Sequence, residues 1–188
     1  MKKVIIIHGI YDDEIEADKP IPVLANSAWL PWLKQELITY GVSTEVPEMP
    51  SPIKPIYDEW KKILQQFDVD EKTILVGHSA GASFLIRWLS ESSINISKLL
   101  LVAPWLDFAN ELETNFSAFS INPDLSNNIM NGITMFYSTD DDHSILDSVA
   151  KIKNEIKYVS IKEFSNRGHF DDFAGTKEFP ELLKEIVK

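Results

Sequence analysis

Six short runs of aliphatic and β-branched residues recur along the chain, separated by longer stretches in which apolar positions follow a helical spacing. Most of these runs lack the alternation of polar and apolar residues that marks a strand with one face in water. They therefore predict strands that are covered on both faces, as in a parallel sheet. The predicted strands are residues 4–7, 43–46, 73–76, 99–102, 133–137 and 158–161.

The stretches between these runs predict five helices. Asn26 or Ser27 is placed to cap the first, and Pro31 suits its first turns. Gly41 should end it, because glycine tolerates the left-handed conformation that follows many helices. Within it, apolar residues recur every three or four positions, at Trp29, Trp32, Leu33, Leu37 and Tyr40. The other predicted helices cover residues 55–67, 79–89, 144–152 and 180–187.

The alternation of predicted strands and helices places the chain in the α/β class. Right-handed crossovers between parallel strands would put helices on both faces of one doubly wound sheet of about six strands. With 188 residues the chain is long enough for one domain and too short for two ordinary ones, so we expect residues 1–188 to form a single domain. The one long interruption, residues 107–131, could carry a small cap over a site, and we expect a minimal lid or none.

The charge balance and the lack of cysteine narrow the possible functions. The 29 acidic and 18 basic residues give a net charge of −11, which repels nucleic-acid phosphates and anionic membranes. We therefore expect no nucleic-acid or membrane partner, and a neutral or cationic small-molecule substrate. Because there is no cysteine, a disulfide framework, a thiolate metal site and a cysteine nucleophile are excluded.

The amino-terminal stretch MKKVIIIHG has two lysines before an apolar run, as secretory signals do. Only four apolar residues follow before His8, whereas a cleavable signal has about 7–15 and a membrane span about 20. We therefore interpret this stretch as the first strand and expect a cytoplasmic protein.

The stretch Gly77-His78-Ser79-Ala80-Gly81 directly follows the third predicted strand and precedes a predicted helix. A doubly wound sheet binds its ligands beyond the carboxyl ends of its strands, which is where Ser79 falls. The two glycines fit a sharp strand-to-helix turn, in which a Cβ atom at either position would collide with a neighbouring segment. Such a turn presents the Ser79 hydroxyl as a nucleophile and aims the amide of Ala80 at a developing oxyanion.

A serine nucleophile needs a base, and the base needs a carboxylate that orients it. The chain order expected for this fold is Ser, then Asp or Glu, then His. His169 lies in a loop between the last strand and the last helix, where a base can reach the strand ends, so we predict that it is the general base. His8 and His78 precede Ser79 and suit local hydrogen bonding and packing. His143 suits an exposed helix start.

The carboxylate should come from the run that ends the fifth strand and contains three consecutive aspartates, Asp140, Asp141 and Asp142. His169 follows Asp141 by 28 positions, which accommodates one helix and one strand, so the two loops should be neighbours. Spacing alone does not choose among the three, because the others can cap the following helix. The run also resembles a cation site, but it lacks the ligand spacing of a calcium loop. We expect no metal and no organic cofactor.

A second oxyanion donor should come from the turn IHGIY at residues 7–11. Gly9 lets the backbone turn, and the amide of Ile10, or alternatively that of Tyr11, would then face the site. The aromatic and acidic residues expected around the mouth would suit a modest apolar or cationic group. They are Tyr11, Asp12, Asp13 and Trp105.

Further stretches accompany these motifs: IIHG after the first strand, AWLPWL at residues 28–33, Met49-Pro50 with Pro52 and Trp60, GHSAG, STDD at 138–141 and GHF at 168–170. Over nearly the whole chain, they resemble the small α/β-hydrolase family that contains the retinoblastoma-binding protein 9 group and the bacterial YdeN-like proteins. The resemblance implies the α/β-hydrolase fold and serine hydrolase activity, and it assigns the triad carboxylate to Asp141. Asp142 stands where some relatives have proline. The family's retinoblastoma contact depends on a cysteine-containing motif, which this chain lacks, so that partner is not expected.

We therefore predict a serine hydrolase that transfers the acyl group of a small ester or amide to water. Ser79 is the predicted nucleophile, His169 the base and Asp141 the carboxylate that orients it. The amides of Ile10 and Ala80 are the predicted oxyanion donors. Two alternatives stay open: a non-catalytic binding module on the same scaffold, and acyl transfer to another acceptor such as peroxide or an amine.

Overall fold

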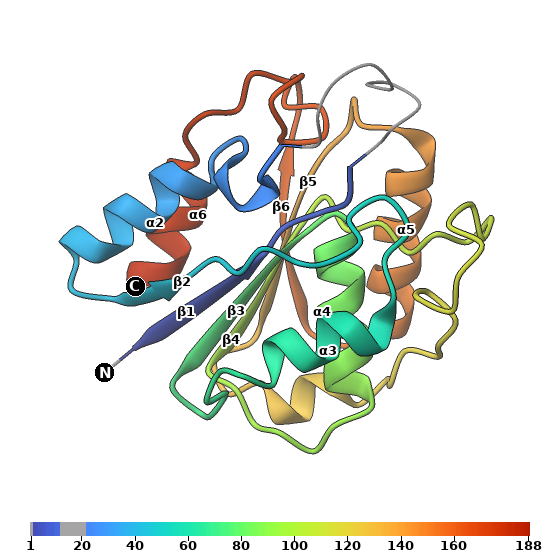
Figure 1. Cartoon of the computed structure of the whole chain (residues 1–188), viewed down its shortest axis with the longest axis horizontal. Coiled ribbons are helices and arrows are strands. Elements are labelled where there is room, and N and C mark those ends of the chain that lie inside the picture. The colour runs from blue at the N-terminus through green and yellow to red at the C-terminus, as the bar shows by residue number, and fades with distance from the viewer. Residues whose placement is uncertain (1, 12–21) are drawn as a thin grey trace.

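The strands of the protein form one parallel sheet, seen in a computed structural model that describes residues 2–11 and 22–188 (Figure 1). The strand order is β2-β1-β3-β4-β5-β6, and every neighbouring pair is parallel. The predicted α/β class and the number of strands are confirmed. The strands are β1 (Lys3–Ile7), β2 (Ser43–Glu45), β3 (Thr73–His78), β4 (Lys98–Val102), β5 (Ile133–Ser138) and β6 (Val159–Phe164).

Helices cover both faces of the sheet (Figure 1). On one face lie α2 (Leu30–Thr39) and α6 (Pro180–Val187), and on the other lie α3 (Tyr57–Leu64), α4 (Ala80–Ser90) and α5 (His143–Glu155). Two short 3₁₀ helices, η1 (Leu24–Asn26) and η2 (Leu125–Asn128), lie in the connections. After β1 the chain adds β2 on one side and β3 on the other. The sheet therefore changes winding direction between β1 and β3, and a crevice at the carboxyl ends is expected there.

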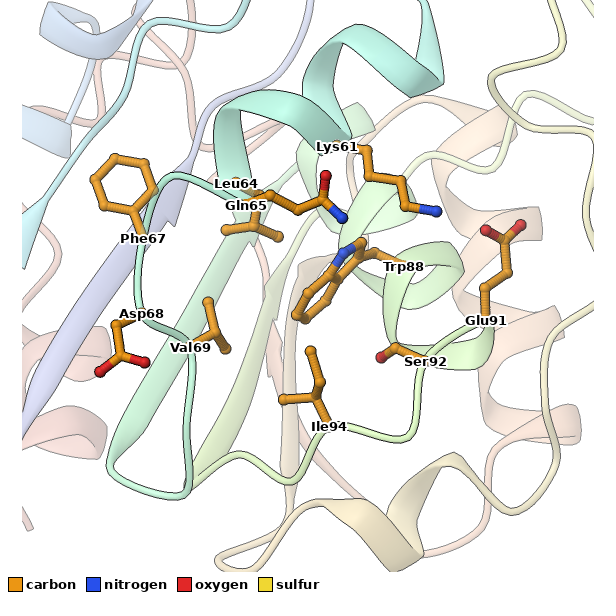
Figure 2. A pocket seen from close by; sticks show the side chains of 10 residues that line it. All are labelled: Lys61, Leu64, Gln65, Phe67, Asp68, Val69, Trp88, Glu91, Ser92 and Ile94. Carbon is orange, nitrogen blue, oxygen red and sulfur yellow. The ribbon is translucent and has the colours of Figure 1, made fainter.

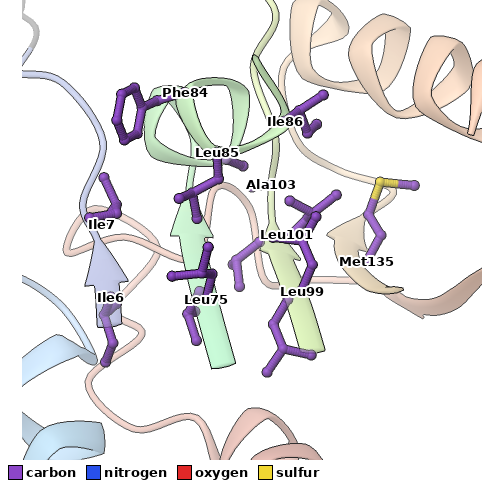
Figure 3. Close-up of a cluster of buried hydrophobic side chains, with 14 of the residues drawn as sticks. Ile6, Ile7, Leu75, Phe84, Leu85, Ile86, Leu99, Leu101, Ala103 and Met135 are labelled. Carbon is purple, nitrogen blue, oxygen red and sulfur yellow. The ribbon is translucent and has the colours of Figure 1, made fainter. Parts of the chain in front are cut away.

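The core lies between the central strands and the helices. All residues of β3 and β5 are buried, as are all but the first of β1 and β4. Figure 3 shows Phe84, Leu85 and Ile86 of α4 over Leu75 of β3 and Leu101 of β4, all in one hydrophobic cluster. Because full burial of such a side chain contributes about 1.5–3 kcal/mol, this packing fixes α4 firmly against the sheet. The start of α4, directly after Ser79, is held with it.

The two edge strands differ from the central four. β6 alternates between half-buried and exposed residues, because only one side of it pairs and one face lies toward solvent. The predicted strand, residues 158–161, begins one residue before β6 and ends three residues short of it. Tyr158 has a φ of 61° and is 85% exposed, so it precedes the strand. Lys162 and Glu163, the polar pair that hid the continuation of the strand, are both exposed.

The predicted cap of the first helix is wrong. Asn26 ends the 3₁₀ helix η1, and neither Asn26 nor Ser27 caps α2 with its side chain. The chain first turns through Ala28, which has a φ of 50°, and α2 begins at Leu30 after Trp29. The predicted Pro31 in the first turn and Gly41 after the helix, with a φ of 71°, agree with the structure.

Residues 107–131 pack along the flank of α3 and α4. Phe116 is buried with its ring 4.9 Å from that of Trp60, and its carbonyl accepts a hydrogen bond of 3.0 Å from the Arg87 guanidinium. Farther along, the amide of Asn122 donates to the hydroxyl of Ser90 at 3.1 Å. These contacts attach the segment to the helices on one face of the sheet.

Candidate active site

Ser79 lies at a strained turn between β3 and α4. Its backbone has φ 55° and ψ −123°, a conformation that costs on the order of 1–3 kcal/mol for a residue other than glycine. A Cβ atom on Gly77 would lie 2.6 Å from the backbone of Ala82, and one on Gly81 would lie 2.4 Å from the carbonyl oxygens of Ile7 and His8. The turn therefore requires both glycines, because any larger residue would collide with the neighbouring backbone.

The main chain of Ser79 is fixed on both sides. Its amide donates to the carbonyl of Val102, the last residue of β4, at 2.9 Å. Its carbonyl accepts from the amide of Ala82 at 3.0 Å and from that of Trp105 at 3.3 Å. Because these partners belong to β4, α4 and the loop after β4, the serine is held where the three segments meet.

The structure brings His169 and Asp141 together. Nδ1 of His169 lies 3.2 Å and 3.1 Å from the two carboxylate oxygens of Asp141. The carboxylate is 3% exposed and also accepts a hydrogen bond of 2.8 Å from the amide of Asp142, whereas the His169 ring is 27% exposed. Among the described residues, no hydrogen bond joins the Ser79 hydroxyl to the His169 ring. Such bonds are often long in ligand-free enzymes and shorten when substrate binds.

The two aspartates next to Asp141 in the sequence form different contacts. Asp140 accepts hydrogen bonds from the Ser138 hydroxyl and from the amides of Arg167 and Gly168, at 3.3 Å and 3.4 Å for the two amides. The Ser138 hydroxyl, and then these amides, hold the pKa of the Asp140 carboxyl below its usual value. Asp142 caps α5 by accepting from the amide of Ser144 at 3.2 Å. Asp141 alone of the three contacts the imidazole, among the contacts of the described chain.

The loop that carries His169 is tightly bent. Asn166, Gly168 and Phe170 all have a positive φ, between 46° and 62°. Phe170 is fully buried, and its ring stacks on that of Phe179 with 5.1 Å between centroids. The bend is therefore anchored in the core by the residue that directly follows His169.

The other histidines have the structural roles expected from the sequence. His143 is exposed at the start of α5. His8 and His78 are buried and hydrogen-bonded to main-chain groups. Burial lowers the pKa of both rings, that of His78 to about 3. One contact was not foreseen: His78 bonds to the backbone of His169, which is far away in the sequence.

The turn after β1 lies directly against Ser79. A Cβ atom on Gly9 would be 3.0 Å from Cβ and 3.5 Å from Oγ of Ser79. The amide of Tyr11 donates to the carbonyl of Pro52 at 2.9 Å, so it is engaged elsewhere. Within the described chain, the amides of Ile10 and Ala80 have no hydrogen-bond acceptor. Of the two amides considered for the second oxyanion donor, that of Ile10 is therefore the better candidate.

The structure describes two of the four residues predicted around the mouth of the site. Trp105 is half-buried and is tied to Ser79 through its amide, and Tyr11 is buried. Asp12 and Asp13 lie outside the described residues.

Two hollows of the described surface lie apart from these residues. One, of about 440 Å³, lies between the ends of α3 and α4, and its lining includes the buried Leu64 and Trp88 together with Lys61 and Glu91 (Figure 2). The loops around it lead into the amino ends of β3 and β4, opposite to Ser79. The other, of about 460 Å³, lies between residues 106–121 and Lys151 of α5. None of the residues that line either hollow is a predicted site residue.

The described residues contain no group of three or more His, Asp or Glu side chains arranged to hold a metal ion. None of the helices described for residues 2–11 and 22–188 is long and apolar enough to cross a membrane.

Comparisons with known proteins point in one direction. Residues 22–188 match the family model described as serine hydrolase. The serine hydrolase RBBP9 of Rattus norvegicus is 25% identical over 168 residues, which are 87% of each chain. YdeN of Bacillus subtilis (strain 168) is 31% identical over 117 residues, 60% of this chain and 54% of YdeN, so this match spans about half the length of that relative.

Solved structures share the fold. The crystal structure of the ydeN gene product from B. subtilis has a TM-score of 0.84 and 22% identity, covering 100% of this chain and 97% of that one. Est1E from Butyrivibrio proteoclasticus, with bound ferulic acid, has a TM-score of 0.65 and 14% identity, covering 100% and 90%. The α/β-hydrolase fold and the resemblance drawn from the sequence motifs are confirmed. The chain belongs to the serine hydrolase family.

Proposed function

We propose that the protein hydrolyses a small ester or amide through a Ser79-His169-Asp141 triad. The observation that best supports this is the contact between the His169 ring and the buried Asp141 carboxylate. It lies at the carboxyl ends of the strands, where Ser79 occupies a strained turn. A carboxylate in this position holds the imidazole in the tautomer that leaves Nε2 free to accept a proton.

In the proposed reaction, Oγ of Ser79 attacks the carbonyl carbon while Nε2 of His169 takes its proton. The carbonyl oxygen becomes an oxyanion, which the amides of Ile10 and Ala80 stabilise. One such donor lowers the barrier by about 3–4 kcal/mol. The tetrahedral intermediate then expels the alcohol or amine, which receives the proton from His169. Water, activated by His169, attacks the acyl-enzyme in the same way and restores Ser79.

Labelling with a fluorophosphonate probe tests this directly. Wild-type protein should be labelled and should turn over p-nitrophenyl acetate, and Ser79→Ala should do neither. Ser83→Ala is a matched control, because the Ser83 hydroxyl is buried in the first turns of α4 and has no partner among the described residues. Labelling that survives in Ser79→Ala, or an unlabelled but folded wild-type protein, would contradict the proposal.

The substrate class can be narrowed with the same pair of proteins. A series of p-nitrophenyl esters of increasing chain length, together with aminoacyl amides, should show turnover by wild type and none by Ser79→Ala. We expect the shortest uncharged or cationic acyl groups to react fastest, because the chain carries a net charge of −11 and the half-buried Trp105 lies beside Ser79. A preference for long or anionic acyl groups would contradict this choice of substrate and leave the triad assignment standing.

A further inference from the structure

Two buried histidines next to Ser79 take no part in the proposed chemistry. His8 directly follows β1, and His78 is the last residue of β3. The ring of each is hydrogen-bonded to the carbonyl of a segment that carries one of the proposed reacting groups. Two independent contacts thus connect side chains outside the triad to the geometry of the site.

The protonation of the His8 ring follows from its partners. The amide of Met49 lies 2.8 Å from Nε2 and can only donate, so Nε2 accepts. The proton of the neutral ring is then on Nδ1, which donates to the carbonyl of Gly9 at 2.6 Å. A T-shaped contact with the Trp60 ring, 5.9 Å between centroids, holds the imidazole plane. The ring is therefore fixed in position and in tautomer.

The carbonyl that His8 holds belongs to the same peptide unit as the amide of Ile10. The described chain has no cis peptide bond, so this amide points away from the carbonyl. When His8 fixes the Gly9 carbonyl on one side, the Ile10 N–H must point to the other. Hydrogen bonding to the carbonyl also polarises the peptide and strengthens its N–H as a donor.

His78 acts on the opposite wall of the site. The carbonyl of His169 can only accept, so Nε2 of His78 donates to it, at 2.8 Å. The two imidazoles are 5.0 Å apart, and the Trp29 ring packs edge-on against His78 at 5.9 Å. Asp140 holds the amides of Arg167 and Gly168 in the same loop. The loop is thus held through two amides before His169 and through the carbonyl of His169 itself.

We propose that His8 and His78 are positioning residues: His8 aims the Ile10 amide at the oxyanion, and His78 holds the backbone of His169 so that its ring stays between Asp141 and Ser79. This inference rests on the proposed function. It adds that two imidazoles, each with a defined tautomer, fix the two partners of the nucleophile, the Ile10 amide and the His169 ring.

Substitution by Asn and Gln separates positioning from simple packing. The side-chain nitrogen of Asn reaches the place of Nδ1 of a histidine, and that of Gln reaches the place of Nε2. His8→Asn should therefore keep the donor to Gly9, and His8→Gln should lose it. For His78 the order is reversed, because the donor to His169 is Nε2. The two variants at each position differ by one methylene, so each serves as the control for the other.

For His8, the readouts are kcat, KM and inhibition by a trifluoromethyl ketone, whose adduct with Ser79 carries an oxyanion. His8→Gln should lower kcat by about 10- to 100-fold with little change in KM, and should weaken inhibition by the same factor. His8→Asn should recover most of both.

For His78, the readouts are kcat/KM and the far-downfield proton resonance of the hydrogen bond between Asp141 and His169. His78→Asn should lower kcat/KM by about 10- to 100-fold and weaken this resonance, because small displacements of a reacting group are costly. His78→Gln should recover most of both.

Several outcomes would overturn the inference. Equal activity of the Asn and Gln variants at either position, with similar thermal midpoints, would show that the donor does not matter. Imidazole ¹⁵N spectra of the wild-type protein give a test without substitution: we expect a proton on Nδ1 of His8 and on Nε2 of His78, and the opposite tautomers would refute it. If Ser79→Ala keeps its activity, the proposed function itself fails and the inference with it, whereas an inactive Ser79→Ala with fully active His8→Gln and His78→Asn refutes the positioning role alone.

Discussion

Replacing His78 by glutamine should make the protein less sensitive to mild acid. In the folded protein, burial lowers the pKa of His78 to about 3, whereas the ring of an unfolded chain titrates near 6.5. Between these values the unfolded state binds a proton that the folded state does not, so stability falls as the pH decreases through this window. Glutamine can keep the hydrogen bond to the His169 carbonyl but does not titrate.

The size of the effect follows from the two pKa values. Between pH 7 and pH 5, the proton taken up by the unfolded ring lowers the free energy of unfolding by about 2 kcal/mol, and the slope approaches about 1.4 kcal/mol per pH unit below pH 6. The carboxyl groups with lowered pKa values, such as those of Asp140 and Asp172, titrate mainly below the range from pH 7 to pH 5. The pKa of His8 is lowered as well, but His8 is present in both proteins, so its contribution cancels in the comparison.

Urea unfolding followed by tryptophan fluorescence, at pH 7 and pH 5, measures this difference. Wild type should lose about 2 kcal/mol more than His78→Gln between the two pH values, even if the variant is less stable at both. His143→Gln is the matched control, since it removes an exposed ring at the start of α5 and should behave as wild type does. Equal losses in wild type and His78→Gln would refute the claim that the buried His78 ring is neutral in the folded protein.

Three further substitutions test the packing and the choice of carboxylate. Gly81→Ala should destabilise the protein by about 3 kcal/mol in urea unfolding, because the new methyl group would lie 2.4 Å from two carbonyl oxygens at the end of β1; a loss below about 1 kcal/mol would contradict this. Phe116→Ala should cost about 3–5 kcal/mol by the same measurement, and a near-neutral result would show that residues 107–131 are not part of the core. Asp141→Asn should lower kcat by about 10⁴-fold, far more than Asp140→Asn, and equal losses would overturn the assignment of the triad carboxylate to Asp141.

Local patterns were sufficient where neighbouring residues determine the structure. The buried runs gave the central strands, because a strand covered on both faces is continuously apolar. The last helix, Pro180–Val187, was placed to the residue, since proline begins it and its apolar spacing is regular. The turn around Ser79 could be recognised because its two glycines are needed for steric reasons that act within a few residues.

Contacts between distant segments could not be read in this way. Spacing left three aspartates as candidates, and only the direction of the backbone after β5 turns Asp141 toward the imidazole and Asp140 toward the loop amides. The bond from His78 to the backbone of His169 joins residues 91 apart, and no local pattern signals it. Ser27 has the side chain of a helix cap, but the turn at Ala28 separates it from α2.

The adjacent aspartates after β5 make this stretch sensitive to its length. Asp140 accepts a hydrogen bond from the backbone of the His169 loop, and Asp141 contacts the His169 imidazole in the same loop. Two consecutive residues therefore hold one loop. Deleting or inserting a single residue between Ser138 and Asp142 would move both carboxylates away from the His169 loop, whereas a substitution removes only one of the two contacts. The protein should therefore tolerate changes in the length of residues 138–142 far less than substitutions in the surrounding loops.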